Sequence, residues 1–227
     1  MPTIVFASPK GGAGKSTSAV LLGTELAASG AAVTIIDADP NRPVARWARL
    51  PGLPANLRVL DDVTEKTIIR VIDDEASRVA FVIVDLEGTA SRMIPYAMSR
   101  ADLVIIPTRA STLDAVEAVA AVREVKQQEE AFRLKIPATI LFTCTSAAIR
   151  TRTLQSIEKD LILNQVPVMS VRLNERDAFR AIFSFGGTLR TLDKTSAPNI
   201  PAAIVNAEAF AREVVTILRT ARAGVAA

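Results

Sequence analysis

The sequence contains no histidine and a single cysteine, Cys144, and these shortages exclude several classes of chemistry. Without histidine, neither a Ser-His-Asp nor a Cys-His mechanism is available. One cysteine excludes a disulfide within the chain and, with histidine missing, a zinc site of the usual kind in one chain. An iron–sulfur site would need cysteines from two chains. We expect Cys144 to be a small core residue at a strand end.

The chain also lacks long apolar runs and is poor in aromatic residues. No run approaches the roughly 20 residues needed to span a bilayer, and the apolar segment 4–7 is too short for a signal peptide. Aromatic residues make up 4% of a chain that is 49% apolar. The core must therefore consist of Ala, Val, Ile and Leu, which suits buried parallel strands covered by helices. We expect a cytoplasmic protein.

The length and charge fit one folded domain spanning residues 1–227. A chain of 227 residues is long enough for a single sizeable α/β domain. Its charged fraction of 22% is ordinary for a globular protein. The net charge of +3 permits contact with nucleic acid or anionic lipid but requires neither.

The order of apolar segments predicts the fold. The expected strands are 3–7, 33–37, 57–60, 80–85, 103–107, 138–143 and 166–171. The expected helices are 15–28, 43–50, 65–77, 113–133, 151–163, 175–183 and 202–219, with a frayed tail over 220–227. Alternating strands and helices imply right-handed crossovers. The pattern predicts an α/β fold with a single doubly wound, mostly parallel sheet and helices on both faces, as in P-loop nucleotide hydrolases.

A glycine-rich loop over residues 9–17 joins the first expected strand to the first expected helix. Its glycines let the backbone curl so that amide N–H groups point at phosphates, and the helix N-terminus adds partial positive charge. In such a loop Lys15 reaches the β- and γ-phosphates and the Ser16 hydroxyl binds Mg²⁺. The generic G-x-x-x-x-G-K-[ST] pattern is not fully met, because Pro9 occupies its first position. The predicted nucleotide contacts are Lys10, Gly11, Gly12, Ala13, Gly14, Lys15, Ser16 and Thr17.

Acidic residues follow two other expected strands. Asp37 and Asp39 come at the end of the second strand, and Asp85 ends the apolar run 81–84 in a Walker B pattern. Ligands of open α/β sheets bind at the carboxyl ends of the strands. Carboxylates at that edge can order the waters around Mg²⁺ and the attacking water. The alternative is that these residues are polar caps where strand turns to loop.

The segment Lys10–Thr17 resembles the deviant Walker A loop of the ParA/MinD ATPases, and the resemblance covers nearly the whole chain. It implies ATP and Mg²⁺ as cofactors, and it implies that Lys10 reaches across a dimer to the partner's nucleotide. By the family's D-x-D-P motif, Asp39 orients or activates water and Asp37 supports the metal shell. The resemblance thus makes Lys10, Lys15 and Asp39 the expected catalytic residues, and Ser16, Asp37 and Asp85 the expected metal site.

The sequence departs from the family after Asp85. Relatives often continue with Thr-Pro-Pro-Gly, whereas this chain has Leu86-Glu87-Gly88. Further along, the segment from Asn174 resembles the part of the family that lies near adenine, which makes Asn174 a candidate base contact. An ordinary polar loop residue is an equal alternative.

The C-terminal half contains several basic residues, and the resemblance suggests two interpretations of them. ParA relatives bind DNA without sequence preference through such residues, in a salt-sensitive way. The alternative is a solvated face with local acidic partners. The residues are Arg150, Arg152, Arg172, Arg176, Arg180, Arg190 and Lys194.

Three functions remain open at this point. The first is a ParA-type partition or positioning ATPase, an ATP-dependent homodimer on nonspecific DNA, nucleoid-associated when ATP-bound and released when a ParB-like or other partner stimulates slow hydrolysis. Residues 39–43 are similar to those of relatives that act in T-DNA transfer. The second is a MinD-type membrane ATPase, which the weakly apolar end 219–227 disfavours. The third is a small-molecule kinase or ligase, against which Lys10 argues.

Overall fold

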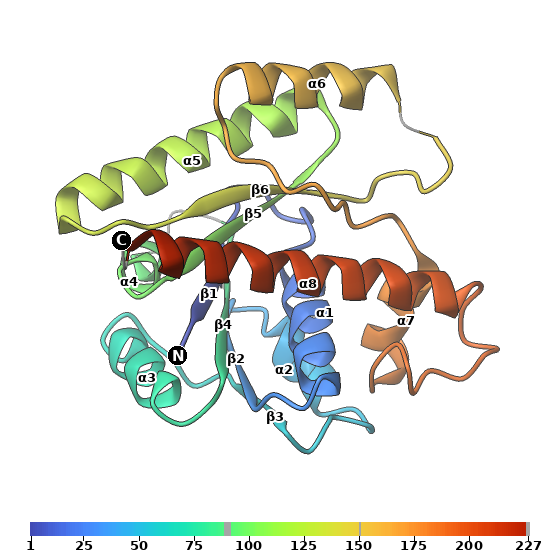
Figure 1. Ribbon diagram of the computed structural model, residues 1–227. Coiled ribbons are helices and arrows are strands. Elements are labelled where there is room, and N and C mark those ends of the chain that lie inside the picture. The colour runs from blue at the N-terminus through green and yellow to red at the C-terminus, as the bar shows by residue number, and fades with distance from the viewer. Residues whose placement is uncertain (89–91, 150, 226–227) are drawn as a thin grey trace.

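Six parallel strands form one sheet in the computed structural model, which describes residues 1–88, 92–149 and 151–225 (Figure 1). Their order across the sheet is β3-β2-β4-β1-β5-β6, and each neighbouring pair is parallel. This confirms the predicted doubly wound sheet. The strands are β1 (Thr3–Phe6), β2 (Val33–Ala38), β3 (Leu57–Leu60), β4 (Phe81–Leu86), β5 (Leu103–Arg109) and β6 (Ala138–Thr143).

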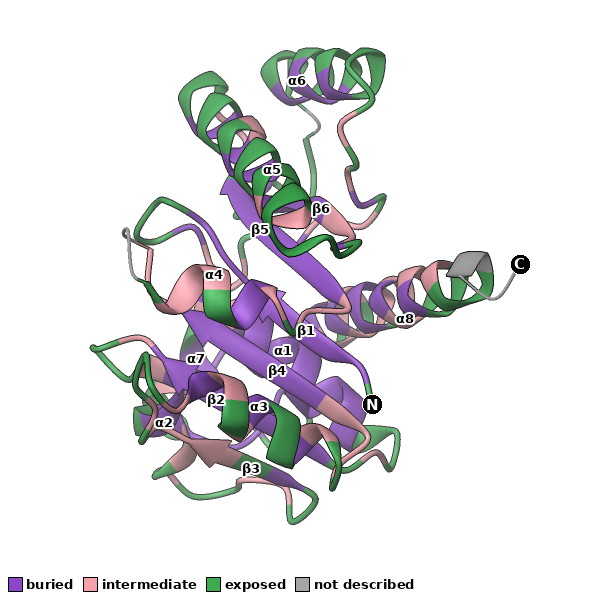
Figure 2. Ribbon diagram, turned by 90° about the vertical axis from the view of Figure 1, so that its left-hand side faces the viewer, coloured by how far each residue is buried: buried purple, intermediate pink, exposed green. Residues whose placement is uncertain are grey.

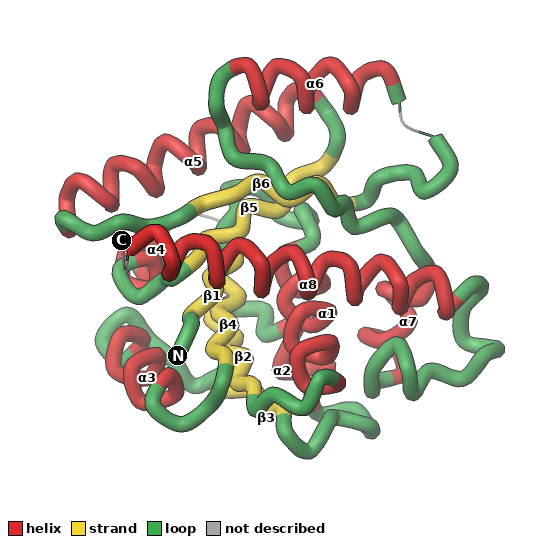
Figure 3. The backbone as a smooth tube through the Cα atoms, in the orientation of Figure 1, coloured by secondary structure: helices red, strands yellow, loops and turns green. Residues whose placement is uncertain are grey.

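Helices cover both faces of the sheet and form two separate cores with it (Figures 1 and 3). One face packs against α1 (Lys15–Ala28), α2 (Pro43–Ala48), α7 (Asp177–Phe185) and α8 (Ile200–Val225). The other packs against α3 (Ile68–Ala76), α4 (Met93–Met98), α5 (Thr112–Phe132) and α6 (Arg152–Leu163). Figure 2 shows the resulting pattern, with the central strands buried and the outer helices buried on one side only.

The central strands form because their residues are apolar, β-branched and covered on both faces. In β1 and β2 every residue is buried, as expected for a parallel sheet between helical layers. Since all six strands run in the same direction, their carboxyl ends meet at one edge. That edge carries the 9–17 loop after β1, the acidic residues of β2 and β4, and the last residues of β5 and β6.

The expected strand 166–171 is wrong. Only Val168 pairs with the sheet there, through an isolated bridge to Ile140 of β6. Pro167 has no N–H to donate to a strand ladder. The N–H groups of Ser170 and Val171 instead donate to the Glu213 carboxylate on α8, at 2.6 and 2.7 Å. The segment is therefore joined to β6 at this one bridge and to α8 by the two bonds to Glu213, and it does not form a strand.

Two other expectations along the chain need correction. The helix α4 was not predicted, because it is short and contains Pro95 near its start. The expected frayed tail is wrong over 220–225, since α8 continues to Val225, and Ala221, Arg222 and Ala223 favour helix there. Residues 226 and 227 lie outside the described part. Within the described residues, no helix is both long and apolar enough to cross a membrane.

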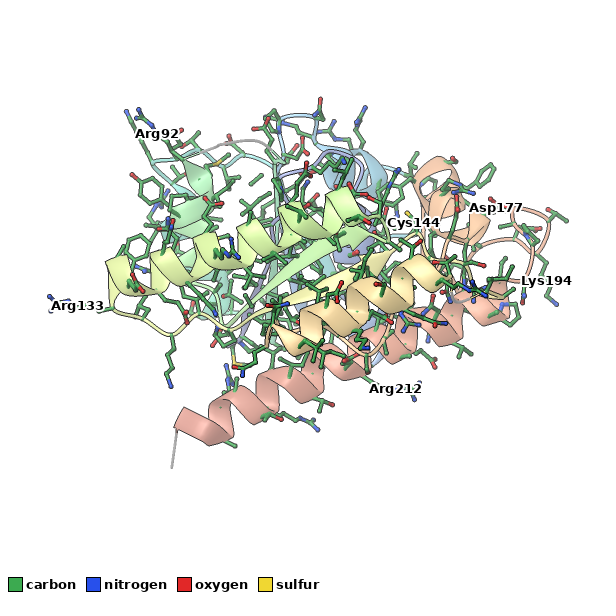
Figure 4. The ribbon with its side chains drawn as sticks, turned by 90° about the horizontal axis from the view of Figure 1, so that it is seen from above. Arg92, Arg133, Cys144, Asp177, Lys194 and Arg212 are labelled. Atoms are coloured by element: carbon green, nitrogen blue, oxygen red, sulfur yellow. The ribbon has the colours of Figure 1, made fainter. Side chains whose placement is uncertain are left out.

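Two side chains contrast in their exposure, and one of them differs from expectation. Cys144 is exposed at the end of β6, in a left-handed conformation with φ of 51°, and is not a core residue (Figure 4). Trp47 is 2% exposed, and its indole N–H donates to the carbonyl of Gly187 at 3.0 Å. It joins α2 to the segment after α7.

Candidate nucleotide site

The 9–17 loop curls tightly between β1 and α1, and two of its glycines are required by geometry. Gly12 and Gly14 have φ values of 74° and 91°, in the left-handed region that side chains disfavour. Gly14 also precedes α1, and its carbonyl accepts the N–H of Ser18 at 2.8 Å. A Cβ on Gly14 would lie 3.4 Å from the Thr143 methyl group. The loop thus forms a tight turn at the start of α1, and its contact with phosphates stays a prediction.

Lys15 is the first residue of α1, and its ammonium group lies at the base of the loop. The side chain is buried, and Nζ donates to the carbonyls of Ser8 and Lys10 at 3.4 and 3.2 Å. Burial lowers the pKa of Lys15, and the negative charges of Asp85, Asp39 and Glu87 oppose that shift. Its partners are neutral carbonyl groups, so an anion bound in the loop would give this ammonium a charged partner.

Asp85 lies at the end of β4, is 0% exposed, and is the least satisfied acid of the site. Among the described residues, neither of its carboxylate oxygens has a hydrogen-bond partner. Burial raises the pKa of Asp85 to about 7, the Ser16 hydroxyl and Lys15 lower it, and the neighbouring acids Asp37 and Asp39 raise it further. The Ser16 hydroxyl is near enough to lower this pKa but lies outside hydrogen-bond geometry, so the buried carboxyl remains costly and is suited to a ligand that supplies positive charge.

Asp37 and Asp39 shape the loop that follows β2. Asp37 is paired in register with Asp85 across the sheet, and burial raises its pKa. Its carboxylate accepts the N–H of Asp39 at 3.3 Å and the N–H of Ala45 at 2.8 Å, which joins β2 to α2. Asp39 is half-buried and accepts the N–H of Asn41 at 2.8 Å. The roles of Asp37 in metal binding and of Asp39 in water activation stay predictions.

These groups fit Mg²⁺ with a nucleoside triphosphate. The unpartnered Asp85 carboxylate, the Ser16 hydroxyl and the glycine loop lie at one edge of the sheet, where oxygen ligands and phosphates would meet. The described residues contain no cluster of three or more His, Cys, Asp or Glu side chains able to hold a metal alone. That pattern suits Mg²⁺, which is usually held by few protein ligands, water and substrate phosphates.

Lys10 is held by acids of its own chain. Its Nζ donates to Asp114 on α5 and lies 4.0 Å from Glu117, with the side chain 49% exposed. The hydrogen bond from Lys10 is the main cause that lowers the pKa of Asp114, and the same bond raises the pKa of Lys10. The predicted contact of Lys10 with a partner's nucleotide therefore stays a prediction, and it requires this ion pair to open.

Asn174 lies on a cavity of about 310 Å³ beside the start of α1. Its side-chain amide oxygen accepts a hydrogen bond from the Thr145 hydroxyl at 2.9 Å, and its backbone N–H donates to the side-chain oxygen of Asn206 at 2.9 Å. Within the described residues, Ser18 Oγ and Arg176 Nε are buried and have no hydrogen-bond partner, and both residues line this cavity. The surface of the cavity is mostly apolar, with a few polar groups in its wall, and base contact by Asn174 stays a prediction.

Several of the basic residues of the C-terminal half have acidic partners. Arg172 pairs with Glu158 at 2.5 Å, and Arg190 pairs with Glu25 and Glu208 at 2.5 and 2.7 Å. Arg180 pairs with Glu175 and Asp177. Lys194, labelled in Figure 4, belongs to the segment between α7 and α8. Arg150 lies outside the described residues. The local ion pairs favour a solvated face for these three arginines.

Sequence reasoning missed two residues that hold the loop and its lysine. The hydroxyl of Thr143, at the end of β6, lies 2.8 Å from the Ala13 carbonyl and 3.1 Å from that of Thr108. Asp114, three residues after the Ser111 cap of α5, binds Lys10. The available signal was their position, Thr143 at the end of β6 and Asp114 just after β5, at the edge of the sheet where the acids of the site also lie.

Known proteins similar to this chain include a ParA protein and VirC1 proteins. A family model described as VirC1 protein matches residues 1–221. Protein ParA of Rhizobium radiobacter is 47% identical over 214 residues, which cover 94% of this chain and 96% of that protein. Protein virC1 of Rhizobium rhizogenes is 30% identical over 224 residues, 96% of each.

Solved structures show the same fold at low sequence identity. Apo McdA of Cyanothece has a TM-score of 0.75 at 16% identity, covering 92% of this chain and 99% of that one. MinD of Aquifex aeolicus has a TM-score of 0.71 at 16% identity, covering 95% of this chain and 97% of that one. At these identities the likeness extends to the fold alone.

Proposed function

Because this chain belongs to the VirC1 family, within the ParA/MinD superfamily of ATPases, we propose that it binds ATP with Mg²⁺ in the 9–17 loop. The ATP-bound chain forms a homodimer that binds DNA without sequence preference. Hydrolysis, slow until a ParB-like or other partner protein stimulates it, releases the DNA. The protein is cytoplasmic and nucleoid-associated in its ATP state, and it acts in partition or positioning of DNA.

One observation carries the proposal: a buried ammonium group and a buried carboxyl group lie at the loop, and among the described residues neither forms an ion pair. The Lys15 ammonium contacts only carbonyl oxygens in the contacts described above. The Asp85 carboxylate has no hydrogen-bond partner among the described residues. Each is costly when left buried, and a bound triphosphate with its Mg²⁺ would satisfy both.

The residues at this edge of the sheet then have separate roles in ATP hydrolysis. Lys15 binds the β- and γ-phosphate oxygens, and the loop amides hold the phosphates in place. Bound Mg²⁺ supplies charge neutralisation at those phosphates, with Ser16 and Asp85 as its expected protein ligands and Asp37 behind them. Asp39 orients the water whose oxygen attacks the γ-phosphorus, and the bond from that phosphorus to the ADP oxygen breaks, which gives ADP and phosphate.

Two solved neighbours support the choice of ligand and of a partner protein. McdA has been solved in complex with ATP, and MinD has been solved in complex with MinC. The 47% identity to Protein ParA supports a role in partition. DNA is the proposed binding surface because of the similarity to Protein ParA and the mildly basic net charge of +3.

The test is a DNA retardation assay with ATP, with ADP and without nucleotide, at several salt concentrations. We expect binding only with ATP and on unrelated DNA sequences alike, with affinity falling steeply as salt rises because phosphate contacts release counterions. Lys15→Ala should lose nucleotide binding by calorimetry and, with it, DNA binding. Sedimentation with anionic liposomes in the ATP state, without DNA retardation, would instead indicate a MinD-type membrane function.

A further inference from the structure

Arg109 is an exposed arginine whose guanidinium rests on the phosphate loop. It is the last residue of β5, which pairs directly with β1, the strand that leads into the loop. A Cβ built on Gly12 would lie 3.5 Å from Arg109 Nη2. The guanidinium therefore lies beside a loop position that has no side chain of its own.

The acidic residues around Arg109 already interact with another residue, Lys10. A cavity of about 90 Å³ next to the loop is lined by Lys10, Arg109, Asp114 and Glu117 together with loop backbone. Asp114 binds Lys10, and Glu117 lies within 4.0 Å of the same ammonium. In the part of the chain that the structure describes, the Arg109 side chain has neither a hydrogen bond nor an ion pair.

The charge of Arg109 nevertheless acts on this cluster. Asp114 raises the pKa of Lys10 and the charge of Arg109 opposes that rise, while Arg109 adds to the lowering of the Asp114 pKa that Lys10 mainly causes. This agrees with the place of all three residues around one cavity. Other exposed arginines of this edge of the sheet differ in this respect. Arg42 and Arg49, which flank α2, both pair with Asp61. Arg109 is thus a cation at the loop whose donors remain available.

We propose that Arg109 binds the terminal phosphate of the ATP held at the loop, from the same side of the loop as Lys10. This inference rests on the proposed function. A guanidinium offers a planar fork of N–H donors that matches phosphate oxygens, and it keeps its charge at any physiological pH. ADP lacks the terminal phosphate, so Arg109 contributes to the distinction between ATP and ADP. It lies outside the Walker A and Walker B segments.

Isothermal calorimetry with Mg²⁺ tests this inference, using AMPPNP and ADP as the two ligands. We expect Arg109→Ala to weaken AMPPNP binding about tenfold or more, as for loss of a charge-assisted pair, and to leave ADP binding within about twofold. The affinity of Arg109→Lys for AMPPNP should lie between those of the wild type and Arg109→Ala, because lysine keeps the charge and lacks the planar fork of donors. Arg123→Ala removes an exposed arginine further along α5 and should bind both ligands as the wild type does.

Three results would overturn it. Equal weakening of AMPPNP and ADP binding by Arg109→Ala would mean that the residue only supports the loop. Unchanged affinity for AMPPNP would mean that the guanidinium contacts no phosphate. If the wild type bound neither nucleotide, the proposed function itself would fail. That result differs from the first two, in which only the role of Arg109 fails. If Arg109→Ala does not fold, the AMPPNP-to-ADP affinity ratio of Arg109→Lys decides in its place.

Discussion

At the residue scale, the site is built around an acid and a base that are buried close to each other without touching. Asp85 and Lys15 influence each other's pKa, yet within the described residues they form no ion pair. An unpaired buried charge destabilises the folded chain, and an acid in this situation tends to keep its proton. The chain without ligand therefore holds a site that is costly to keep and favourable to fill.

Replacement of Asp85 should change how stability depends on pH. The raised pKa of about 7 means that the folded chain holds a proton that the unfolded chain releases above about pH 4. The stability that this group contributes is thus present at low pH and is lost as the pH rises to 7. We expect Asp85→Asn without nucleotide to melt several degrees above the wild type at pH 8, with the gap closing toward pH 5.

Thermal melts followed by circular dichroism across that pH range measure the gap. A gap of constant size at every pH would show that Asp85 is not protonated in the folded chain. Calorimetry with ATP, with and without Mg²⁺, supplies the second measurement. We expect Asp85→Asn to lose the gain in affinity that Mg²⁺ gives the wild type.

Asp39→Ala should trap the ATP-bound state. We expect its phosphate release to fall about 100-fold or more, as for loss of a group that assists the attacking water, while ATP binding persists. The measurements are phosphate release and gel filtration with ATP. Asp62→Ala is the matched control, since Asp62 is an exposed acid on the loop after β3. Hydrolysis by Asp39→Ala at the wild-type rate would remove Asp39 from the mechanism.

At the element scale, the phosphate loop depends on β6 as well as on β1 and α1. The Thr143 hydroxyl reaches the Ala13 carbonyl, and the Thr143 methyl group faces Gly14. The loop is therefore held from the side by a strand that lies two places away from β1 in the sheet. Its shape is set before a ligand arrives, which reduces the ordering cost of binding.

Thr143→Val should loosen this support while keeping the side-chain volume. We expect it to lower the free energy of unfolding by about 1 kcal/mol, because the carbonyl groups lose a buried donor. It should also weaken ATP and ADP binding alike. Urea unfolding and calorimetry measure the two effects. Thr139→Val, at another buried threonine of β6, is the control. Nucleotide binding at wild-type strength in Thr143→Val would show that the loop keeps its shape without β6.

The elements that could be predicted from sequence are those whose signal is local. Runs such as Phe81–Leu86 are apolar and β-branched enough to be buried strands anywhere, and the glycine loop carries its function in consecutive residues. The segment 166–171 looked similar by composition. Its N–H groups bind Glu213, more than 40 residues later, and no local pattern reveals that.

The parts of the site that were missed depend on contacts between distant segments. Thr143 lies 130 residues from Ala13, and Asp114 lies 104 residues from Lys10. Only the strand order, which places β5 beside β1 and β6 next to β5, brings these residues to the loop. Cys144 was placed in the core because strand ends are usually buried, whereas its left-handed backbone turns the side chain outward.

At the scale of the whole molecule, the residues of the site lie along one edge of a single sheet. Lys10 extends from this edge and is held by Asp114 and Glu117 of α5. In the proposed dimer, Lys10 leaves these acids for the partner's nucleotide. Formation of the dimer then exchanges the ion pair of Lys10 with these acids for a contact with the partner's phosphates. The stability of the dimer depends on the strength of both interactions.

Lys10→Ala should therefore separate nucleotide binding from dimerisation. We expect the variant to bind ATP with nearly wild-type affinity, because Lys15 and the loop remain, and to stay monomeric with ATP. Calorimetry and size-exclusion chromatography with light scattering measure the two properties. Lys126→Ala, at an exposed lysine of α5, is the control and should dimerise. A dimer of normal mass in Lys10→Ala would exclude the role of Lys10 in the partner's site.

The burial of Trp47 gives this chain a built-in optical probe. It is the only tryptophan in the sequence, so intrinsic emission above that of tyrosine comes from one place. The indole is enclosed by the core and bonded to Gly187, and α2 begins four residues after Asp39. Its fluorescence spectrum will be blue-shifted in the folded chain and will move to longer wavelength on unfolding, which checks every variant without a label.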